Sequence, residues 1–251
     1  MVINQIKKIM NVEKLIYCLL LGVSSLFSAC VVAQKGTTST VDPIAENMLL
    51  YQRSIGGWPK HINDVKVDYN KSLLESEKSG VLEDRNRNDA TIDNGATTKE
   101  VRHLVKAYKN TGNAAYLKSA EEGIRYLLLM QKPNGGFPQF YPDSSSYRGH
   151  ITYNDNAMIN ALNILWDVAY GIDGLEVVNK ELKAAALKGV QNGIDCILRT
   201  QIKVSGKLTG WCAQHDKTTL LPVKARAFEH PSISGMETVG VVAFLMKVNQ
   251  P

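Results

Sequence analysis

The chain has 251 residues, of which 44% are hydrophobic and 21% charged, and its formal net charge is +5. This composition is ordinary for a soluble globular protein, and the length is sufficient for one domain with a substantial core. The mildly basic charge suits an anionic substrate, but it lacks the dense basic stripe of a nucleic-acid-binding protein. After residue 34, no apolar stretch of the sequence is long enough to span a bilayer.

Residues 1–33 have the layout of an export signal. Three lysines and then an apolar run, residues 15–27, precede a group of small residues. One cleavage site lies before Cys30, which would become a lipidated first residue and attach the protein to a membrane, and another follows Ala33. An uncleaved anchor helix is a third alternative. In each case we expect the domain of residues 34–251 to be exported and to be extracellular, periplasmic or lipid-anchored at the cell surface.

Two cysteines, Cys196 and Cys212, lie outside this signal. In an oxidising compartment they can form a disulfide, and two buried unpaired thiols are the alternative. Cys212, His215 and His230 could suggest a zinc site, but the Cys-x-x-His spacing of the first two is weak evidence by itself.

Six segments of the domain carry helical patterns. The first begins with Asp42 and Pro43, a typical N-cap followed by proline at the first helical position. Apolar residues then recur every three or four positions in each segment, and the segments 156–169 and 236–246 are apolar on almost every side, which predicts burial. We expect helices at residues 42–53, 96–109, 114–130, 156–169, 181–200 and 236–246.

A short motif occurs three times, in which a glutamine at a helix end is followed by glycine and then by an aromatic residue. The glutamines are Gln52, Gln131 and Gln201, and the aromatic residues are Trp58, Phe137 and Trp211. We expect these aromatic residues to occupy related positions and mainly to pack their loops onto the helices. The alternation of amphipathic and apolar helices predicts an all-α fold, an α/α toroid of three helix pairs. Its long loops, residues 54–95, 132–154 and 202–234, would lie at one rim and are of the length that usually carries function.

Acidic residues stand where the inner helices begin. Asp93, Asp155 and Glu237 occupy these positions, and the equivalence of the pairs predicts that they converge at one mouth of the toroid. Each could simply cap its helix. Two Asp-Asn pairs after long loops indicate instead an oxygen-rich site of the kind that Ca²⁺ prefers.

The third loop adds positive charges. Lys217 and Lys224 are lysines of the kind that are usually solvated. Arg226 differs, because it stands among apolar residues and close to Glu229 and His230. We therefore regard Arg226 as the functional candidate of this loop.

Six segments of the sequence resemble the family 10 polysaccharide lyases, which are pectate lyases. In the family's order they are 56–60 (GGWPK), 91–98 (TIDNGATT), 135–142 (GGFPQFYP), 151–158 (ITYNDNAM), 211–216 (WCAQHD) and 225–229 (ARAFE). The resemblance implies an α/α toroid that cleaves polygalacturonate by Ca²⁺-assisted β-elimination. It also implies roles for single residues: an arginine base, Arg226; two Ca²⁺ ligands, Asp93 and Asp155; and substrate contacts, Asn94, Thr98 and Lys224.

Members of this family continue beyond the point that corresponds to Pro251, so we expect a domain that is incomplete at its C-terminus, and the activity of the shortened form is left open. Three other functions fit part of the sequence. A glycoside hydrolase would use Asp93 with Asp155 or Glu237 as acid and base. A terpene cyclase shares the glutamine–glycine–tryptophan repeat, but the export signal and the lack of an Asp-rich motif argue against it. The third is a non-catalytic pectin-binding protein.

Overall fold

The structure, a computed structural model, describes residues 41–248. The chain divides into two units, Met1–Thr38 and Ser39–Pro251, and every described residue belongs to the second. The predicted export signal, with Cys30 and Ala33, lies outside the described residues. Within residues 41–248, no helix combines the length and the apolar character needed to cross a membrane.

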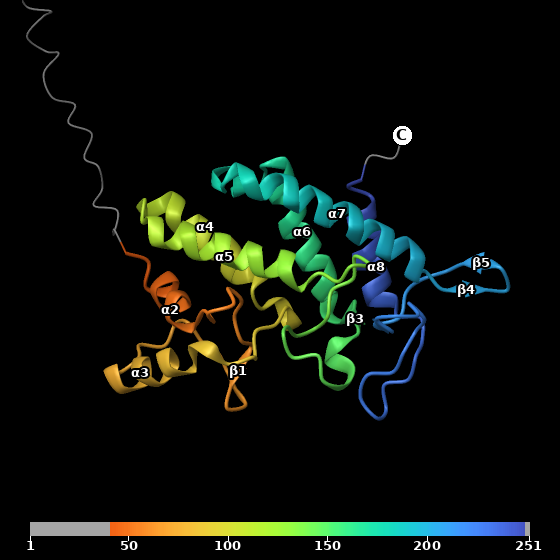
Figure 1. Cartoon of the computed structure of the whole chain (residues 1–251), viewed down its shortest axis with the longest axis horizontal. Coiled ribbons are helices and arrows are strands. Elements are labelled where there is room, and N and C mark those ends of the chain that lie inside the picture. Colours follow the sequence, from red (N-terminus) through yellow and green to blue (C-terminus); the bar gives the residue numbers. More distant parts are fainter. Residues whose placement is uncertain (1–40, 249–251) are drawn as a thin grey trace, which may run out of the picture. The chain divides into compact units, whose positions relative to one another are not determined.

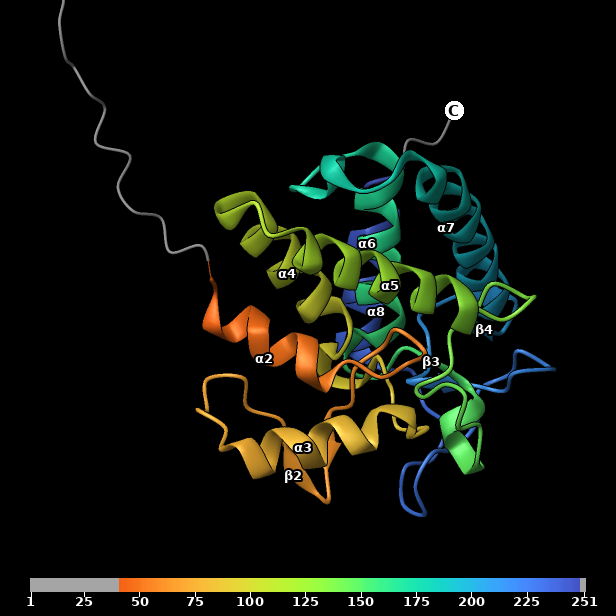
Figure 2. The same ribbon diagram turned by 60° about the vertical axis from the view of Figure 1, so that its left-hand side comes forward.

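Six of the helices in the described part follow one another along the chain as alternating outer and inner helices (Figure 1). The first pair is α2 (Pro43–Tyr51) with α4 (Thr98–Thr111), the second is α5 (Ala114–Met130) with α6 (Ala157–Tyr170), and the third is α7 (Lys180–Thr200) with α8 (Gly235–Leu245). In each pair the outer helix comes first and the inner helix second. Each outer helix contacts the next outer helix and each inner helix contacts the next inner one. In Figure 2, α6 and α8 run behind α5. The predicted α/α toroid of three helix pairs is confirmed, and each helix boundary lies within two residues of its predicted position.

Local sequence signals explain where the helices begin and end. Asp42 caps α2, because its Oδ1 accepts hydrogen bonds at 3.0 Å from two backbone N–H groups of the first turn. The side chains of Asn113 and Asn179 cap α5 and α7 in the same way. Helices α4 and α6 end at Gly112 and Gly171, which have the left-handed backbone that favours glycine. Helix α6 is buried along most of its length, as its apolar sequence predicts.

The three repeated glutamines make related hydrogen bonds. Each side-chain amide donates to the backbone carbonyl two residues before the aromatic residue of its loop; the acceptors are Gly56, Gly135 and Thr209. In the first two loops the same amide also donates to the next outer helix, from Gln52 to Ser119 O at 2.9 Å and from Gln131 to Gly189 O at 2.8 Å. The glutamine therefore closes its own loop and ties it to the neighbouring helix pair.

The aromatic residues of the three loops occupy related positions, as predicted. The backbone carbonyls of Trp58, Phe137 and Trp211 accept hydrogen bonds from the N–H groups of Thr91, Thr152 and Ser234, respectively. All three aromatic side chains are buried. The two indole N–H groups donate to carbonyls of the preceding outer helices, those of Met48 and Ile197. Their role is packing, which fixes each loop against the helix before it.

Glycine is required where the first two loops press against the next outer helix. A Cβ atom at Gly56 would lie 2.4 Å from Glu122 O, and one at Gly135 would lie 1.8 Å from Asn192 O. Both glycines also have positive φ, of 99° and 87°. Thr209 takes this position in the third loop, where no further outer helix follows within the described residues.

The loops contain short elements that the sequence analysis did not predict. The first loop contains β1 (His61–Ile62), β2 (Val65–Lys66) and α3 (Glu75–Glu83). Strand β3 (Ile151–Thr152) of the second loop pairs antiparallel with β6 (Gln214–His215) of the third. The third loop also forms a hairpin of β4 (Lys203–Val204) and β5 (Lys207–Leu208). Single helical turns occur at Asp84–Asn86 (η1), Asp93–Gly95 (η2), Ser146–Gly149 (η3), Asn154–Asn156 (η4) and Leu175–Val177 (η5).

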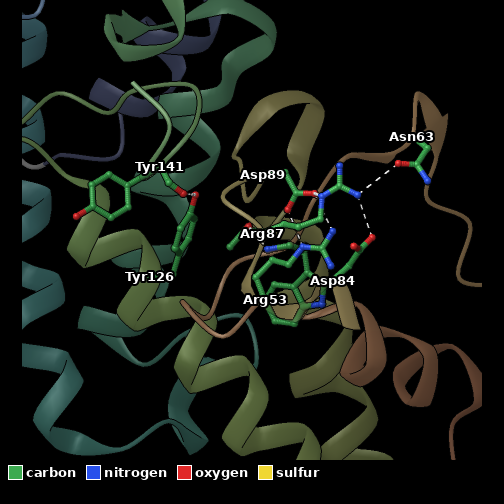
Figure 3. A network of polar contacts seen from close by, with 9 residues as sticks. Arg53, Asn63, Asp84, Arg87, Asp89, Tyr126 and Tyr141 are labelled. Atoms are coloured by element: carbon green, nitrogen blue, oxygen red, sulfur yellow. Dashed lines mark hydrogen bonds and ion pairs between the residues drawn. The ribbon is translucent and has the colours of Figure 1, made fainter. Parts of the chain in front are cut away.

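The first loop is anchored by a buried arginine (Figure 3). The side chain of Arg53 has no exposed surface, and its Nε and Nη2 donate to the two carboxylate oxygens of Asp89 at 2.6 and 2.8 Å. Arg87 pairs with Asp84 and reaches Asn63 beside it. The two-point contact fixes the start of the loop to the segment that leads into η2.

The two cysteines of the domain are unpaired. Cys196 and Cys212 are both buried free thiols, so the disulfide alternative is wrong. Burial raises the pKa of the Cys196 thiol to about 12, which keeps it protonated.

Candidate active site

The turns η2 and η4, which precede α4 and α6, lie in contact with each other. In η2 the backbone of Asn94 has a φ of 48°, and in η4 the backbone of Asp155 has a φ of 52°. Both residues lie three positions after the residue whose N–H binds the aromatic residue's carbonyl. Asp155 is therefore the equivalent of Asn94, and the expected equivalence of Asp93 with Asp155 is wrong by one residue. Among residues other than glycine, Asn and Asp adopt a left-handed backbone most readily, which explains the residue types.

A cavity of about 610 Å³ lies beside these two turns. It is lined by four of the six predicted site residues: Asp93, Asn94, Asp155 and Arg226. Thr98 lies elsewhere, at a smaller cavity of about 440 Å³ that it shares with Arg102 and Lys247. Lys224 is exposed and lies outside the set of residues that line the larger cavity. Asp93 and Asp155 line the same cavity, whereas Glu237, which was expected to converge with them, is not among its lining residues.

Asp93 is the buried carboxylate of this cavity, with 6% of its surface exposed. Lys60 Nζ donates to its Oδ2 at 2.6 Å. Its other oxygen, Oδ1, is buried and has no hydrogen-bond partner among the described residues. A buried carboxylate oxygen without a donor is costly, and Asp93 lines the cavity, so Oδ1 is a candidate ligand atom for a cation.

Asp155 is exposed, and its carboxylate is open to solvent at the cavity. Asn154 Nδ2 donates to its Oδ2 at 2.7 Å. Its backbone N–H donates to Glu237 Oε1 at 3.3 Å, and the other carboxylate oxygen of Glu237 accepts a hydrogen bond from Ser234. Glu237 is thus engaged in holding η4 against the start of α8.

Arg226 reaches the cavity from the third loop and is 62% exposed. Its guanidinium is paired with the carboxylate of Glu229, and its backbone N–H donates to the same carboxylate at 3.0 Å. The ring of Phe228 lies 5.8 Å from the guanidinium carbon. The hydrogen bond with Glu229 raises the pKa of Arg226 above its ordinary value, so this arrangement favours the charged form.

His215 is buried and both of its ring nitrogens are engaged. Nδ1 donates to Leu220 O at 2.9 Å, and Nε2 accepts from the backbone N–H of Cys212 at 3.1 Å. Burial lowers the pKa of His215, which keeps the ring neutral. This geometry leaves neither ring nitrogen for a metal, so the zinc alternative at Cys212 and His215 is wrong.

A family model described as pectic acid lyase matches residues 52–251. The chain belongs to the pectic acid lyase family. Among solved structures it is similar to a family 10 polysaccharide lyase from Cellvibrio cellulosa, with 37% identity and a TM-score of 0.73. It is also similar to a mutant of that enzyme in complex with trigalacturonic acid, with 36% identity and the same TM-score. Among curated proteins nothing matches.

Each of the two structural matches covers 87% of this chain but only 63% of the solved chain, so this chain spans less than two thirds of the length of those relatives. The resemblance to family 10 lyases drawn from the sequence motifs is thereby confirmed.

The sequence analysis missed three cavity residues of this family member that occupy equivalent positions. Lys60, Gln139 and Ala213 each lie two residues after the aromatic residue of their loop, and all three line the cavity. The repeat itself carried this signal, because a loop position that faces the site in one pair faces it in the others. Gln139 and Gln214 both line the cavity, and the Oε1 atom of each is buried without a hydrogen-bond partner among residues 41–248.

The oxygen atoms at this cavity fit part of a Ca²⁺ shell. Ca²⁺ takes six to eight oxygen ligands from carboxylates, amide carbonyls and water. The free Oδ1 of Asp93, the open carboxylate of Asp155 and the unpartnered oxygen of Gln139 are ligands of this kind. In the described part of the chain, no three His, Cys, Asp or Glu side chains come together to hold a metal. The set therefore fits a cation that takes its remaining oxygens from water and from an anionic ligand.

Proposed function

We propose that this chain is a pectate lyase that cleaves polygalacturonate by β-elimination, with Arg226 as the base and with Ca²⁺ held by Asp93 and Asp155. The observation that carries the proposal is the meeting of Asp93, Asn94, Asp155 and Arg226 at one cavity in a member of the pectic acid lyase family. The complex of the similar Cellvibrio cellulosa enzyme with trigalacturonic acid supports an acidic sugar as the ligand.

The reaction removes a proton from C5 of a galacturonate unit, next to its carboxylate. The electron pair of that C–H bond forms the C4–C5 double bond, and the C4–O bond breaks. The leaving oxygen takes up a proton from water, so that one product carries an unsaturated end and the other a new hydroxyl group. Bound Ca²⁺ supplies positive charge to the substrate carboxylate, which acidifies the C5 proton. Asn94 offers an amide at the same cavity that can orient the sugar.

The proposal requires a change around Arg226. A guanidinium paired with Glu229 is a poor base, since the pairing stabilises its charged form. Substrate entering the cavity would place Arg226 beside the C5 proton and exclude water from its exposed side chain. The reaction therefore needs the contact between Arg226 and Glu229 to open or to exchange for contacts with the substrate.

We also propose that the protein acts outside the cytoplasm. The export signal of residues 1–33 supports this location, and cleavage before Cys30 would anchor the domain to a membrane through a lipid. A polymeric acidic substrate, which does not cross membranes, suits such a location.

The test is a spectroscopic assay with polygalacturonate. A lyase generates the ultraviolet absorbance of unsaturated uronates, and a chelator abolishes it when Ca²⁺ is required. Release of reducing ends without that absorbance identifies a glycoside hydrolase and contradicts the proposal. Binding of polygalacturonate without either signal identifies a non-catalytic pectin-binding protein.

A further inference from the structure

We propose that Lys60 is a built-in counter-cation of Asp93, which keeps the affinity of the free protein for Ca²⁺ low until an acidic sugar binds. The inference rests on the proposed function in one respect, the assignment of Asp93 to Ca²⁺. The role of Lys60, and the dependence of tight Ca²⁺ binding on the sugar, go beyond that assignment.

The first observation is the geometry of the pair. Lys60 Nζ lies 2.6 Å from Asp93 Oδ2, and the two side chains are 25% and 9% exposed. The free oxygen, Oδ1, belongs to the same carboxylate. A cation bound at Oδ1 would therefore lie close to the ammonium group of Lys60, and the two positive charges would repel each other.

The position of Lys60 is fixed by the backbone on both sides. Pro59 pairs with Ala90 in an isolated β-bridge, and Lys60 O accepts a hydrogen bond from Val67 N at 3.1 Å. The hairpin of β1 and β2 begins at the next residue, His61. Because the backbone is held in this way, Lys60 can leave Asp93 only by a rotation of its side chain.

The internal repeat supplies the second observation. The positions equivalent to Lys60 are Gln139 and Ala213, and those equivalent to Asp93 are Asn154 and Met236. The first helix pair has both the buried carboxylate and the lysine at these two positions. The second and third helix pairs have neutral residues at both. This match indicates that Lys60 is present to balance the charge of Asp93 and is not needed to form the loop.

The charges around the site explain the effect on a metal. Asp93 and Asp155 contribute two negative charges and Lys60 contributes one positive charge. Glu237 keeps its negative charge, but its two oxygens accept hydrogen bonds from Asp155 N–H and Ser234, so they are not free to bind an ion. The charge of Arg226 is balanced by Glu229. Ca²⁺ affinity depends on the charge of the ligand set, so this set holds the ion weakly. A sugar carboxylate adds negative charge and a partner for the ammonium group, so each ligand strengthens binding of the other by the same factor.

The experiment is a calorimetric titration of Ca²⁺ into the protein without sugar, at constant pH near neutrality. We compare the wild type with Lys60→Met and Lys60→Gln, the second of which introduces the residue found at the equivalent position of the second loop. Lys66→Met is the matched control, because Lys66 is an exposed lysine of the hairpin that follows Lys60. Far-ultraviolet circular dichroism and thermal unfolding establish that each variant is folded.

We expect both Lys60 variants to bind Ca²⁺ at least tenfold more tightly than the wild type, a difference of about 1.4 kcal/mol. The control is expected to change less than twofold, and Asp93→Asn added to Lys60→Gln should remove the gain. Trigalacturonate should raise Ca²⁺ affinity in the wild type by a larger factor than in the Lys60 variants.

Three results would overturn the inference: equal or weaker Ca²⁺ binding by folded Lys60 variants, no Ca²⁺ binding by any variant, or weaker trigalacturonate binding with unchanged Ca²⁺ affinity. The last would make Lys60 a substrate clamp. Because these titrations need no turnover, a gain in Ca²⁺ affinity in a protein that forms no unsaturated product would contradict the lyase function and leave the inference on Lys60 standing.

Discussion

Arg226 and Glu229 form an ion pair at the edge of the cavity that contains Asp93 and Asp155. The residue proposed as the base is thus paired in the free protein with a group that stabilises its protonated form. Substitutions at the two residues of this ion pair test whether Arg226 is a base and whether Glu229 tunes its pKa.

Replacing Arg226 with alanine is expected to lower kcat by about 10³-fold or more, because general-base catalysis is lost. Ca²⁺-dependent binding of oligogalacturonate should remain close to that of the wild type. Arg226→Lys should not restore activity, since a flexible ammonium group does not reproduce the planar guanidinium. Steady-state kinetics and calorimetry check this. If Arg226 only binds the substrate anion, alanine will weaken binding and lysine will partly restore it.

Replacing Glu229 with glutamine tests the environment of the base. Glu229 raises the pKa of Arg226, so its neutralisation lowers that pKa and increases the unprotonated fraction at any pH below it. We expect the rising limb of the pH profile of kcat to move to lower pH. A uniform loss of activity, with the limb unmoved, would show that Glu229 positions Arg226 and does not tune it.

Arg53→Met is expected to reduce the free energy of unfolding by about 3 kcal/mol, because it leaves the carboxylate of Asp89 without its two-point partner. Arg87→Met is the control in the same network (Figure 3). Arg87 is 44% exposed, and its loss should cost about 1 kcal/mol or less. Urea denaturation measures both. Equal effects would show that burial does not govern the strength of these pairs.

Gly135→Ala is expected to destabilise the fold by roughly 3 kcal/mol, since the added Cβ would lie 1.8 Å from Asn192 O. Gly206→Ala is a matched control, because Gly206 has a similar positive φ of 79° but nothing within 4 Å of its Cβ position. The control should cost about 1 kcal/mol from backbone strain alone. Comparable losses in thermal or urea unfolding would mean that the loop can withdraw from α7 without cost.

The helices and their pairing were predictable because apolar periodicity, caps and the glutamine repeat all indicated the same arrangement. The exact alignment of the site residues between the first and second loops was not predictable. Whether Asp93 or Asn94 corresponds to Asp155 depends on a left-handed residue, and residue types alone do not identify which of two adjacent polar positions adopts it. The pairing of β3 with β6 escaped because strands of two residues show no alternation and join loops distant in sequence.

Lys60 escaped for a different reason. A lysine in a long loop is usually solvated, and its contact with Asp93 spans 33 positions of sequence that only the fold brings together. Thr98 was assigned to substrate binding from the resemblance to family 10 lyases, yet it begins α4 and lines the smaller cavity. The roles of Asp93, Asp155, Asn94, Thr98, Lys224 and Arg226 in binding and catalysis stay predictions.

Because Gln52 and Gln131 each bind the next outer helix, the stability of each helix pair depends on the pairs beside it. Gln52 links the first pair to α5 and Gln131 links the second pair to α7, so each pair is supported by its neighbours in the series. Within the described residues α6 has a helix pair on each side, so its amides should exchange with solvent more slowly than those of α2. Residues from the loops of all three helix pairs line the cavity. Local unfolding of any one pair would therefore disrupt it. A ligand that contacts the first and third loops at the same time would hold them together and slow amide exchange in both α2 and α8.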